Sequence, residues 1–334
     1  MDGRLLGGEA AAFGLARPPL IREPSAFNLA GLEALVGRGT IAGLCVLARR
    51  LHQAFHNQDL EGPPGERFVA ATLAKYEMGT LTERAIPVVV QVARFDPWKD
   101  PLGVIEAHRA AREHLPQGAN QPHLVLVGPL ADDDPEADSV LAGLRAAVSA
   151  EHGGVHVVPL RAAEAHRTSE QEDALRELGL APEMLGPGDL VDLEINAFQT
   201  RADVIIAKSL REGFGLAVTG AGYHGKPRIV SEVGGLPAQV IDGRARVHAC
   251  LVGGRPFDRE ASIRMTRDWL LRLLVSPTLR SALAASARRH VLRTFLPHRH
   301  LADYYRLSLD LHRRRLALHA VDEPQRGVAL RSAA

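Results

Sequence analysis

The sequence predicts an α/β protein built on a Rossmann-like parallel sheet. Short apolar runs rich in β-branched residues indicate strands at 88–92, 124–127, 155–158 and 203–207. Helical patterns occur at 100–114, 136–150, 216–223, 259–274, 277–295 and 300–318. This alternation of strands with helices is typical of a parallel sheet.

Length and composition exclude several classes of protein. The 334 residues are 46% hydrophobic, which allows a sizeable core and is consistent with two domains. A net charge of +1 provides no general basic field, so we expect no nucleic-acid partner. No signal-peptide pattern and no apolar span of about 18 residues occurs, so we expect no membrane association. Cys45 and Cys250 are too few for a disulfide framework, which favours a reduced, cytoplasmic setting.

The segment 208–216 is the most informative part of the sequence, because it directly follows the strand 203–207. Ligands of open α/β sheets bind at the carboxyl ends of strands, and the segment opens there with a lysine. Gly213 and Gly215 let the backbone approach a ligand closely, and Glu212 could accept hydrogen bonds from sugar hydroxyls. The helix that follows presents N–H groups that attract anions. The segment therefore predicts a site for a diphosphate carrying a sugar.

Three other interpretations of these glycines compete with a diphosphate-sugar site. The stretch 220–226 matches the Gly-x4-Gly-Lys pattern of a P-loop, but Pro227 stands where a Ser or Thr would hold Mg²⁺. A dinucleotide fingerprint fails because Val218, three residues after Gly215, is not glycine. An ordinary glycine turn between strand and helix is the remaining interpretation, and we favour it less.

A second group of cations follows the strand 88–92. Arg94 and Lys99 can both lie at the carboxyl end of this strand, with Lys99 opening the next helix. Only four of the 40 basic residues are lysines, and three of these four, Lys99, Lys208 and Lys226, lie in motif segments. This usage suggests that compact ammonium groups serve these positions, although Lys99 and Lys226 also fit solvated helix and turn ends.

Four motifs occur in order along the chain, at 91–105, 126–136, 194–199 and 211–216. With them, the region 87–243 resembles the nucleotide-binding half of retaining family-four glycosyltransferases, and among these the trehalose synthase group. The resemblance implies a GT-B architecture of two Rossmann-like domains with an NDP-glucose donor between them. It also implies a glucose acceptor, an α,α-trehalose product and retention of the donor's α configuration. In such a transfer, prepositioned cations stabilise the charge of the leaving diphosphate, so no metal is required.

The resemblance and the residue chemistry together assign the site. Arg94 and Lys208 are expected to hold the diphosphate and Glu212 the sugar, and these three are the expected catalytic residues. The expected donor-binding residues are Lys99, Gly128, Gly213, Phe214, Gly215, Leu216 and Ala217. We expect no metal site and no cofactor. The expected partners are NDP-glucose and glucose, and a homodimer stays an open alternative.

Other polar stretches favour structural roles. The acidic run 132–134 with Glu136 could bind a metal, but such a run just before a helix more often caps it. The histidine-containing stretches 298–300 and 312–315 fall at or within predicted helices, so solvated helix faces are favoured over metal or nucleic-acid sites. The polar insertion 164–187, bounded by Pro and Gly, is expected to form a short helix on a surface loop.

One position departs from the family pattern within the site. The family carries a second carboxylate eight positions after the first, where it holds the donor ribose, and that position here is Gly220. Loss of a charge-assisted hydrogen bond of about 1.5–3 kcal/mol would weaken donor binding roughly tenfold or more.

The second departure is the length of chain before residue 86, because an acceptor domain usually has about 100–200 residues. The expected divisions are a shortened, mostly helical amino-terminal region at 1–85, the nucleotide-sugar-binding domain at 86–298, a crossover helix at 299–323 and a tail at 324–334. Two alternatives to trehalose synthesis therefore stay open. One is a catalytically impaired nucleotide-sugar-binding remnant, and the other is a family-four glycosyltransferase with another acceptor.

Overall fold

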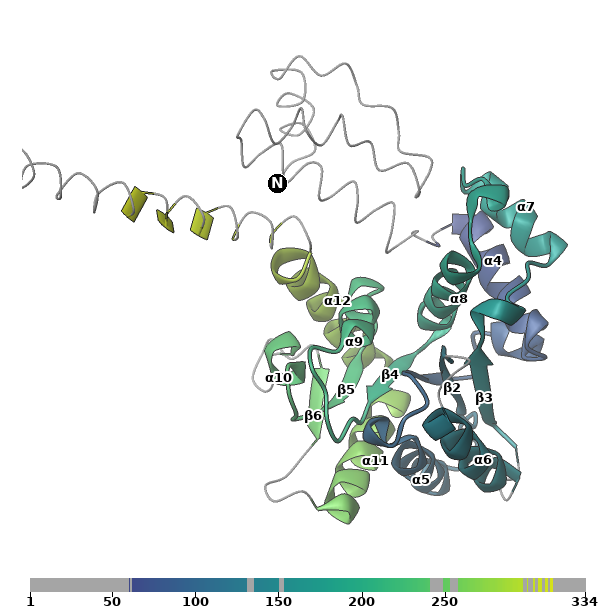
Figure 1. Cartoon of the computed structure of the whole chain (residues 1–334). Coiled ribbons are helices and arrows are strands. Elements are labelled where there is room, and N and C mark those ends of the chain that lie inside the picture. Colours follow the sequence, from purple (N-terminus) through teal and green to yellow (C-terminus); the bar gives the residue numbers. More distant parts are fainter. Residues whose placement is uncertain are drawn as a thin grey trace, which may run out of the picture. The chain divides into compact units, whose positions relative to one another are not determined.

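The computed structural model of the chain describes most residues from position 60 onward (Figure 1). The described residues are 60, 62–130, 135–149, 153–240, 249–252, 258–296, 299, 303, 306, 307, 310, 311, 313 and 314. Contacts divide the chain into two units, of which the first comprises Met1–Ile21, Ala26–Ala54 and Phe295–Ala334. The second unit comprises Arg22–Ser25 and Phe55–Thr294, and every helix and strand named below belongs to it.

Within the described residues, six strands form one sheet in the order β3-β2-β1-β4-β5-β6. Their bounds are β1 Val88–Val92, β2 His123–Pro129, β3 Val155–Leu160, β4 Val204–Ala207, β5 Arg228–Ser231 and β6 Ala249–Val252. Every neighbouring pair is parallel. The predicted parallel sheet is confirmed, and its strand order is that of a Rossmann-like fold, with the order reversing between β1 and β4.

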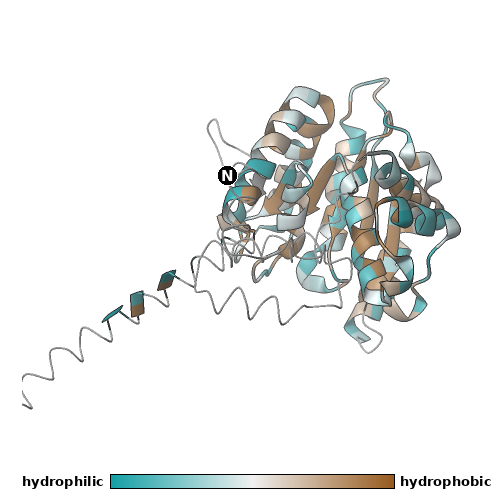
Figure 2. Cartoon of the chain, turned by 90° about the horizontal axis from the view of Figure 1, so that it is seen from above, coloured by the Kyte–Doolittle hydropathy of each residue, from teal (hydrophilic) through white to brown (hydrophobic). Residues whose placement is uncertain are grey.

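The strand residues alternate between two apolar cores, because successive side chains of a strand point to opposite faces of the sheet. In β1, Val88 and Val90 belong to one buried cluster and Val89 belongs to the other. Figure 2 shows apolar residues concentrated on the strands and polar residues on the outer sides of the helices. Burial on both faces accounts for the nearly continuous apolar runs in the sequence.

Helices cover both faces of the sheet (Figure 1). One face is covered by α8 (Pro187–Arg201), with α4 (Gly62–Lys75) and α7 (Ser169–Glu177) packed beside it. The other face is covered by α5 (Pro101–Glu113), α6 (Pro135–Ser149) and α11 (Arg259–Val275). The remaining helices are α9 (Leu216–Tyr223), α10 (Leu236–Gln239), α12 (Pro277–Thr294) and the 3₁₀ turns η1 (Gly79–Thr82), η2 (Pro97–Lys99), η3 (Ala162–Glu164) and η4 (Pro182–Met184).

The insertion at 164–187 contains the expected short helix, but the helix packs into the domain instead of lying on a surface loop. α7 begins with a capping box in which Thr168 and Gln171 bond each other's backbone N–H groups. Ala174 and Leu175 are fully buried in the core that α4 and α8 share. These are the only apolar residues among the nine of α7, which is too few to reveal a buried face from sequence.

A buried polar network around Glu194 joins α4, α7 and α8. Glu194 accepts hydrogen bonds from the Lys75 ammonium and the Tyr76 hydroxyl, each at 2.7 Å. It also accepts one from the Gln171 amide at 3.1 Å. Burial, followed by the hydrogen bond to Glu194, raises the pKa of Tyr76. A buried polar network whose members bond one another rigidifies a core. Lys75, the one lysine outside the sequence motifs, therefore has a structural role in this network.

Several sequence predictions concern positions outside the described part of the chain. They include the region 1–59, the acidic run 132–134, most of the expected crossover helix and the whole expected tail. Among the residues that the structure describes, no helix is both long and apolar enough to cross a bilayer. The same residues contain no group of three His, Cys, Asp or Glu side chains suited to a metal ion.

Gly128 in β2 is packed closely against the end of β1. A Cβ at this position would lie 1.8 Å from the carbonyl oxygen of Ala93, so a side chain would force the two segments apart. We expect Gly128→Ala to lower the free energy of unfolding by about 2 kcal/mol or more. The matched control is Gly143→Ala in α6, where a Cβ meets open space and should stabilise by up to about 1 kcal/mol. Urea denaturation measures both, and equal stabilities would contradict the packing role of Gly128.

Candidate functional site

The candidate site lies at the carboxyl edge of the sheet, where the strand order reverses. β1 and β4 are neighbours in the sheet, so the loops that follow them meet at this edge. The loop after β1 carries Lys99, and the loop after β4 carries Glu212. The Lys99 Nζ lies 2.7 Å from Glu212 Oε2, although the two residues are 113 positions apart in the sequence. The structure thus brings two predicted site residues into contact.

Two further contacts join the same loops at Trp98. The backbone N–H of Leu210 donates to the Trp98 carbonyl at 2.7 Å. The Arg211 guanidinium lies over the Trp98 ring, 4.0 Å from its centroid, in cation–π geometry. The amide of Gln91, a buried residue of β1, donates to the Lys99 carbonyl at 2.8 Å. The backbone that presents Lys99 is therefore held both by its own strand and by the neighbouring loop.

Lys208 is fully buried, and its ammonium bonds the carboxylate of Asp100. Asp100 has a φ of 46°, a left-handed conformation that Asp tolerates, and its side chain accepts from the Gly103 N–H at 3.1 Å. Asp100 thus caps α5 and also pairs with the cation that follows β4. The sequence predicted Lys208 at the diphosphate, whereas this structure places the Lys208 ammonium beneath the surface of the site.

The glycine loop that follows Glu212 is braced by α10. Gly215 is the N-cap of α9 and has a φ of 88°, a conformation that favours glycine. The Gln239 amide donates to the carbonyl oxygens of Phe214 and Gly215. Thr219 in turn donates to the Gln239 amide oxygen at 2.6 Å. These bonds fix the turn that places the amino end of α9 beside Glu212.

The amino end of α9 forms another part of the site. The N–H groups of the first turn, at Leu216 and Ala217, have no acceptor within the helix and carry the positive end of its dipole. The loop is open to solvent here, because Leu216 is 77% exposed and Phe214 is 43% exposed. With Lys99 on the adjoining loop, these groups form an edge suited to a phosphate.

Arg94 follows β1 and is largely solvent-exposed. Its guanidinium lies 3.5 Å from Asp96 Oδ2, and 69% of the Arg94 side chain is accessible. Asp96 itself is buried, and its other carboxylate oxygen has no hydrogen-bond partner in the structure. The contact is long and the Arg94 side of it is open to solvent, so the ion pair is weak and Arg94 can turn to a stronger anion.

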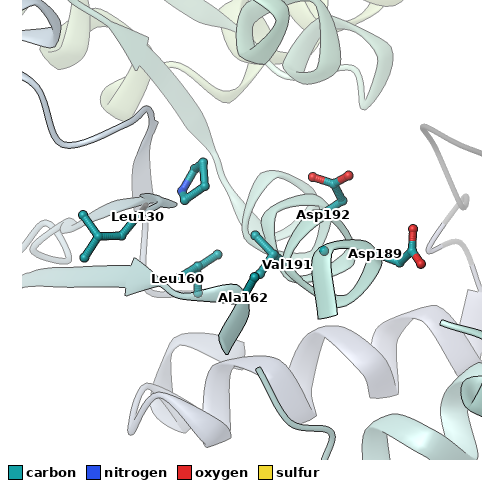
Figure 3. Close-up of a pocket in the computed structure, with 8 residues that line it drawn as sticks. Leu130, Leu160, Ala162, Asp189, Val191 and Asp192 are labelled. Carbon is teal, nitrogen blue, oxygen red and sulfur yellow. The ribbon is translucent and has the colours of Figure 1, made fainter. Parts of the chain in front are cut away.

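A pocket of about 480 Å³ lies at the ends of β2 and β3, on the same edge of the sheet. Its lining residues come from these strand ends, from η3 and from the first turns of α8: Pro129, Leu130, Leu160, Ala162, Gly188, Asp189, Val191 and Asp192. Figure 3 shows Leu130 and Leu160 on one side and the carboxylates of Asp189 and Asp192 on the α8 side. Gly128 precedes the lining residue Pro129 in β2.

Gly220 lies in α9 and faces Gln199 of α8. A Cβ at Gly220 would lie 3.0 Å from Gln199 Oε1, at the limit of tolerable packing. Gln199 is buried, and its amide donates to the Ala217 carbonyl at 3.0 Å. The family pattern has a second carboxylate at this position. In this chain, α9 instead packs closely against α8 here, with Gly220 against the buried amide of Gln199.

Gly222, which is also in α9, leaves space for the buried side chain of Arg228 from β5. A Cβ there would lie 2.4 Å from Arg228 Nη1, which donates to the Val218 carbonyl at 2.9 Å. Burial lowers the pKa of Arg228 to about 9, and its Nε and Nη2 have no hydrogen-bond partner in the structure. Lys226, the remaining motif lysine, precedes β5 and donates to the Thr200 carbonyl at 2.7 Å, so it lies at the amino edge of the sheet.

Sequence reasoning missed the residues that support the site. Asp100 could have been found as a helix cap, because it directly precedes Pro101 at a predicted helix start. Its pairing with Lys208 had no sequence signal, since the two residues are 108 positions apart. Trp98 and Gln239 likewise act through contacts with distant loops.

Comparisons with known proteins identify the family. A family model described as glycosyl transferases group 1 matches residues 83–252, which contain all six strands and the site described above. The chain therefore belongs to the glycosyl transferases group 1 family, and the described domain has the Rossmann-like fold of a GT-B glycosyltransferase domain. The crystal structure of a glycosyltransferase from Rickettsia africae shares this fold with a TM-score of 0.50 and 16% identity, over 76% of this chain and 55% of that one.

The similar proteins include trehalose synthases. The trehalose synthase of Rubrobacter xylanophilus is 33% identical over 235 residues, which cover 70% of this chain and 46% of that enzyme. The trehalose synthase of Pyrococcus horikoshii is 33% identical over 221 residues, covering 65% of this chain and 42% of that enzyme. The chain thus spans less than half the length of these relatives. The predicted resemblance to the trehalose synthase group is confirmed.

Asp100→Asn tests the buried contact between the two loops. Asn keeps an oxygen for the α5 cap and tolerates the left-handed backbone, so the substitution removes mainly the charge. Lys208 would lose its carboxylate partner, and we expect the free energy of unfolding to fall by about 3 kcal/mol or more. Chemical denaturation is the measurement.

The control for this variant is Asp138→Asn. Asp138 forms a 3.4 Å ion pair with Arg161, and its side chain is 71% exposed. Its replacement should therefore change the free energy of unfolding by less than about 1 kcal/mol. Similar losses in the two variants would show that Asp100 and Lys208 do not hold the loops together.

Proposed function

We propose that the chain binds a nucleotide-sugar at the carboxyl edge of its sheet. We further propose that it takes part in glucosyl transfer from NDP-glucose to glucose, giving α,α-trehalose with retention of configuration. The observation that carries the binding proposal is the meeting of Lys99, Glu212 and the amino end of α9 where the strand order reverses. Similarity to proteins named trehalose synthases supports trehalose as the product.

In this proposal Lys99, Arg94 and the first N–H groups of α9 hold the diphosphate. The leaving diphosphate gains negative charge as the glycosidic bond breaks, and groups already in place stabilise that charge most in the transition state. Lys208 acts beneath them by holding the loops through Asp100, which replaces the direct contact that the sequence predicted. Charge neutralisation is assigned to these groups, and the proposal includes no metal ion.

Glu212 accepts hydrogen bonds from hydroxyls of the donor sugar, because its carboxylate lies beside the proposed diphosphate position. The pocket at the ends of β2 and β3 takes the nucleoside, with the ring against Leu130 and Leu160. Retention follows from attack on the same face as the leaving group, with the diphosphate taking the acceptor proton. A pair of carboxylates of the glycosidase kind is then unnecessary.

Gly220 favours a second candidate function, which is nucleotide-sugar binding with impaired transfer. The close contact between α9 and Gln199 provides no carboxylate for the donor ribose at this position. A donor held by fewer charge-assisted bonds would bind less tightly and be oriented less strictly. The two candidates share a ligand and differ in turnover.

A turnover assay separates the two candidates. The full chain is incubated with glucose and with UDP-, ADP- or GDP-glucose, and release of nucleoside diphosphate and formation of trehalose are followed. We expect trehalose above the control without protein for one of the donors, and loss of most of this activity in Lys99→Met. Binding of a donor without product would support the second candidate, and absence of both binding and product would exclude both.

Gly220→Glu tests the missing carboxylate. The new side chain must displace the Gln199 amide by a few tenths of an ångström, and it should then add a charge-assisted bond to the donor. We expect the dissociation constant for the donor to fall by about tenfold. Gly220→Ala is the matched control, because it adds the same Cβ and helix propensity without the charge. Isothermal titration with the donor compares them, and equal affinities of the two variants would contradict the prediction.

A further inference from the structure

Both carboxylate oxygens of Glu212 accept hydrogen bonds within the protein. Glu212 Oε2 lies 2.7 Å from the Lys99 ammonium and accepts from the Ser209 hydroxyl at 3.3 Å. Glu212 Oε1 accepts from the Gly213 N–H at 3.1 Å. The Lys99 and Glu212 side chains are 15% and 16% exposed, so solvent reaches the pair only in part. The two groups assigned above to the diphosphate and to the sugar are therefore bonded to each other.

A partly buried ion pair of this kind resists separation, because each charge loses hydration and is stabilised by the other. A ligand with only a diphosphate could take Lys99, but it would leave Glu212 without its cation and beside new negative charge. A ligand that carries both a diphosphate and a sugar replaces both partners at once. The diphosphate bonds Lys99, and the sugar hydroxyls donate to Glu212.

We propose that Lys99 and Glu212 form an exchangeable ion pair that makes the site select an intact nucleotide-sugar over the nucleoside diphosphate left after transfer. The pair opens when both ligand groups are present. It closes again when the sugar has left, and its closure displaces the diphosphate from Lys99. This inference rests on the proposed function, since it assigns the nucleotide-sugar to the same site.

The surrounding contacts allow such an exchange without movement of the loops. The loops are joined independently by the Leu210 bond to Trp98, by Arg211 on the Trp98 ring and by Lys208 on Asp100. The Lys99 carbonyl is separately fixed by Gln91. Only the ends of two side chains need to turn, and a variant that lacks the Glu212 charge keeps all of these contacts.

Glu212→Gln tests the exchange, because it removes the negative charge and keeps the size of the side chain. Isothermal titration of the full chain without acceptor measures UDP, ADP and GDP and the corresponding NDP-glucose compounds. We expect the dissociation constant for the preferred nucleoside diphosphate to fall by about tenfold, because Lys99 is released. The affinity for NDP-glucose should stay equal or decrease, so the preference for the intact donor falls by about tenfold or more.

Glu232→Gln is the matched control. Glu232 is an exposed carboxylate that directly follows β5 at the same edge of the sheet, so its replacement changes the net charge equally. We expect less than about a twofold change in affinity for either ligand, because exposed charges are screened. Equal tightening in both variants would reduce the effect to net charge and overturn the proposal.

A double-mutant cycle with Lys99→Met locates the effect. In the Lys99→Met background, Glu212→Gln should tighten binding of nucleoside diphosphate much less, because only the repulsion by the Glu212 charge is relieved and no cation is released. Tightening in that background as large as in the natural chain would overturn the exchange. The single variant Glu212→Gln gives a second test, once its melting temperature shows that it is folded. If this variant binds nucleoside diphosphate no more tightly than the natural chain, the exchange is also overturned.

Titration with inorganic pyrophosphate distinguishes a failure of this inference from a failure of the proposed function. If the natural chain binds no nucleotide and no nucleotide-sugar, the proposed function is excluded. Tighter pyrophosphate binding by Glu212→Gln than by the natural chain would still support exchange at Lys99. The absence of pyrophosphate binding by both proteins would then overturn the exchange as well.

Discussion

The reversal of strand order between β1 and β4 is the constraint on which the rest of the structure depends. Parallel strands end at one edge, and β1 and β4 lie side by side there because the chain builds the sheet outward in two directions. This arrangement brings the loop of Lys99 against the loop of Glu212 across 113 positions of sequence. A different order of the same strands would separate the two loops, and neither would form a site alone.

Four of the six described strands, β1 to β4, were predicted from sequence, because a sheet buried on both faces imposes continuous apolar runs. The helices α5, α6, α9, α11 and α12 were also predicted, whereas the elements β5, β6, α4 and α8 were not. The edge of the site was predictable for the same reason, since charged and glycine residues follow β1 and β4. The partners of those residues were not. Lys208 and Asp100 each have an ordinary local context, and only the meeting of the loops pairs them. The packing of α7 was also hidden, because two apolar residues in a polar helix give no periodic signal.

The two glycines of α9 have a packing explanation. Helix propensity alone counts against Gly220 and Gly222, because glycine is less favourable in a helix than alanine by about 1 kcal/mol. In the structure, Gly220 lies against Gln199 and Gly222 leaves the volume that Arg228 occupies. The helix that presents its amino end to the site therefore rests on a buried amide and a buried guanidinium. Gly220 and Gly222 thus both serve the close packing of α9.

The contacts around Trp98 and Asp100 also make the amino-acid sequences of the two loops depend on each other. Trp98 and Asp100 belong to one loop, and Arg211 and Lys208 belong to the other. A substitution on either side leaves its counterpart with an exposed ring face or an uncompensated charge, so drift at these positions should be correlated across related chains. Anyone transplanting the glycine loop into another Rossmann-like scaffold would have to carry both loops together as a single module.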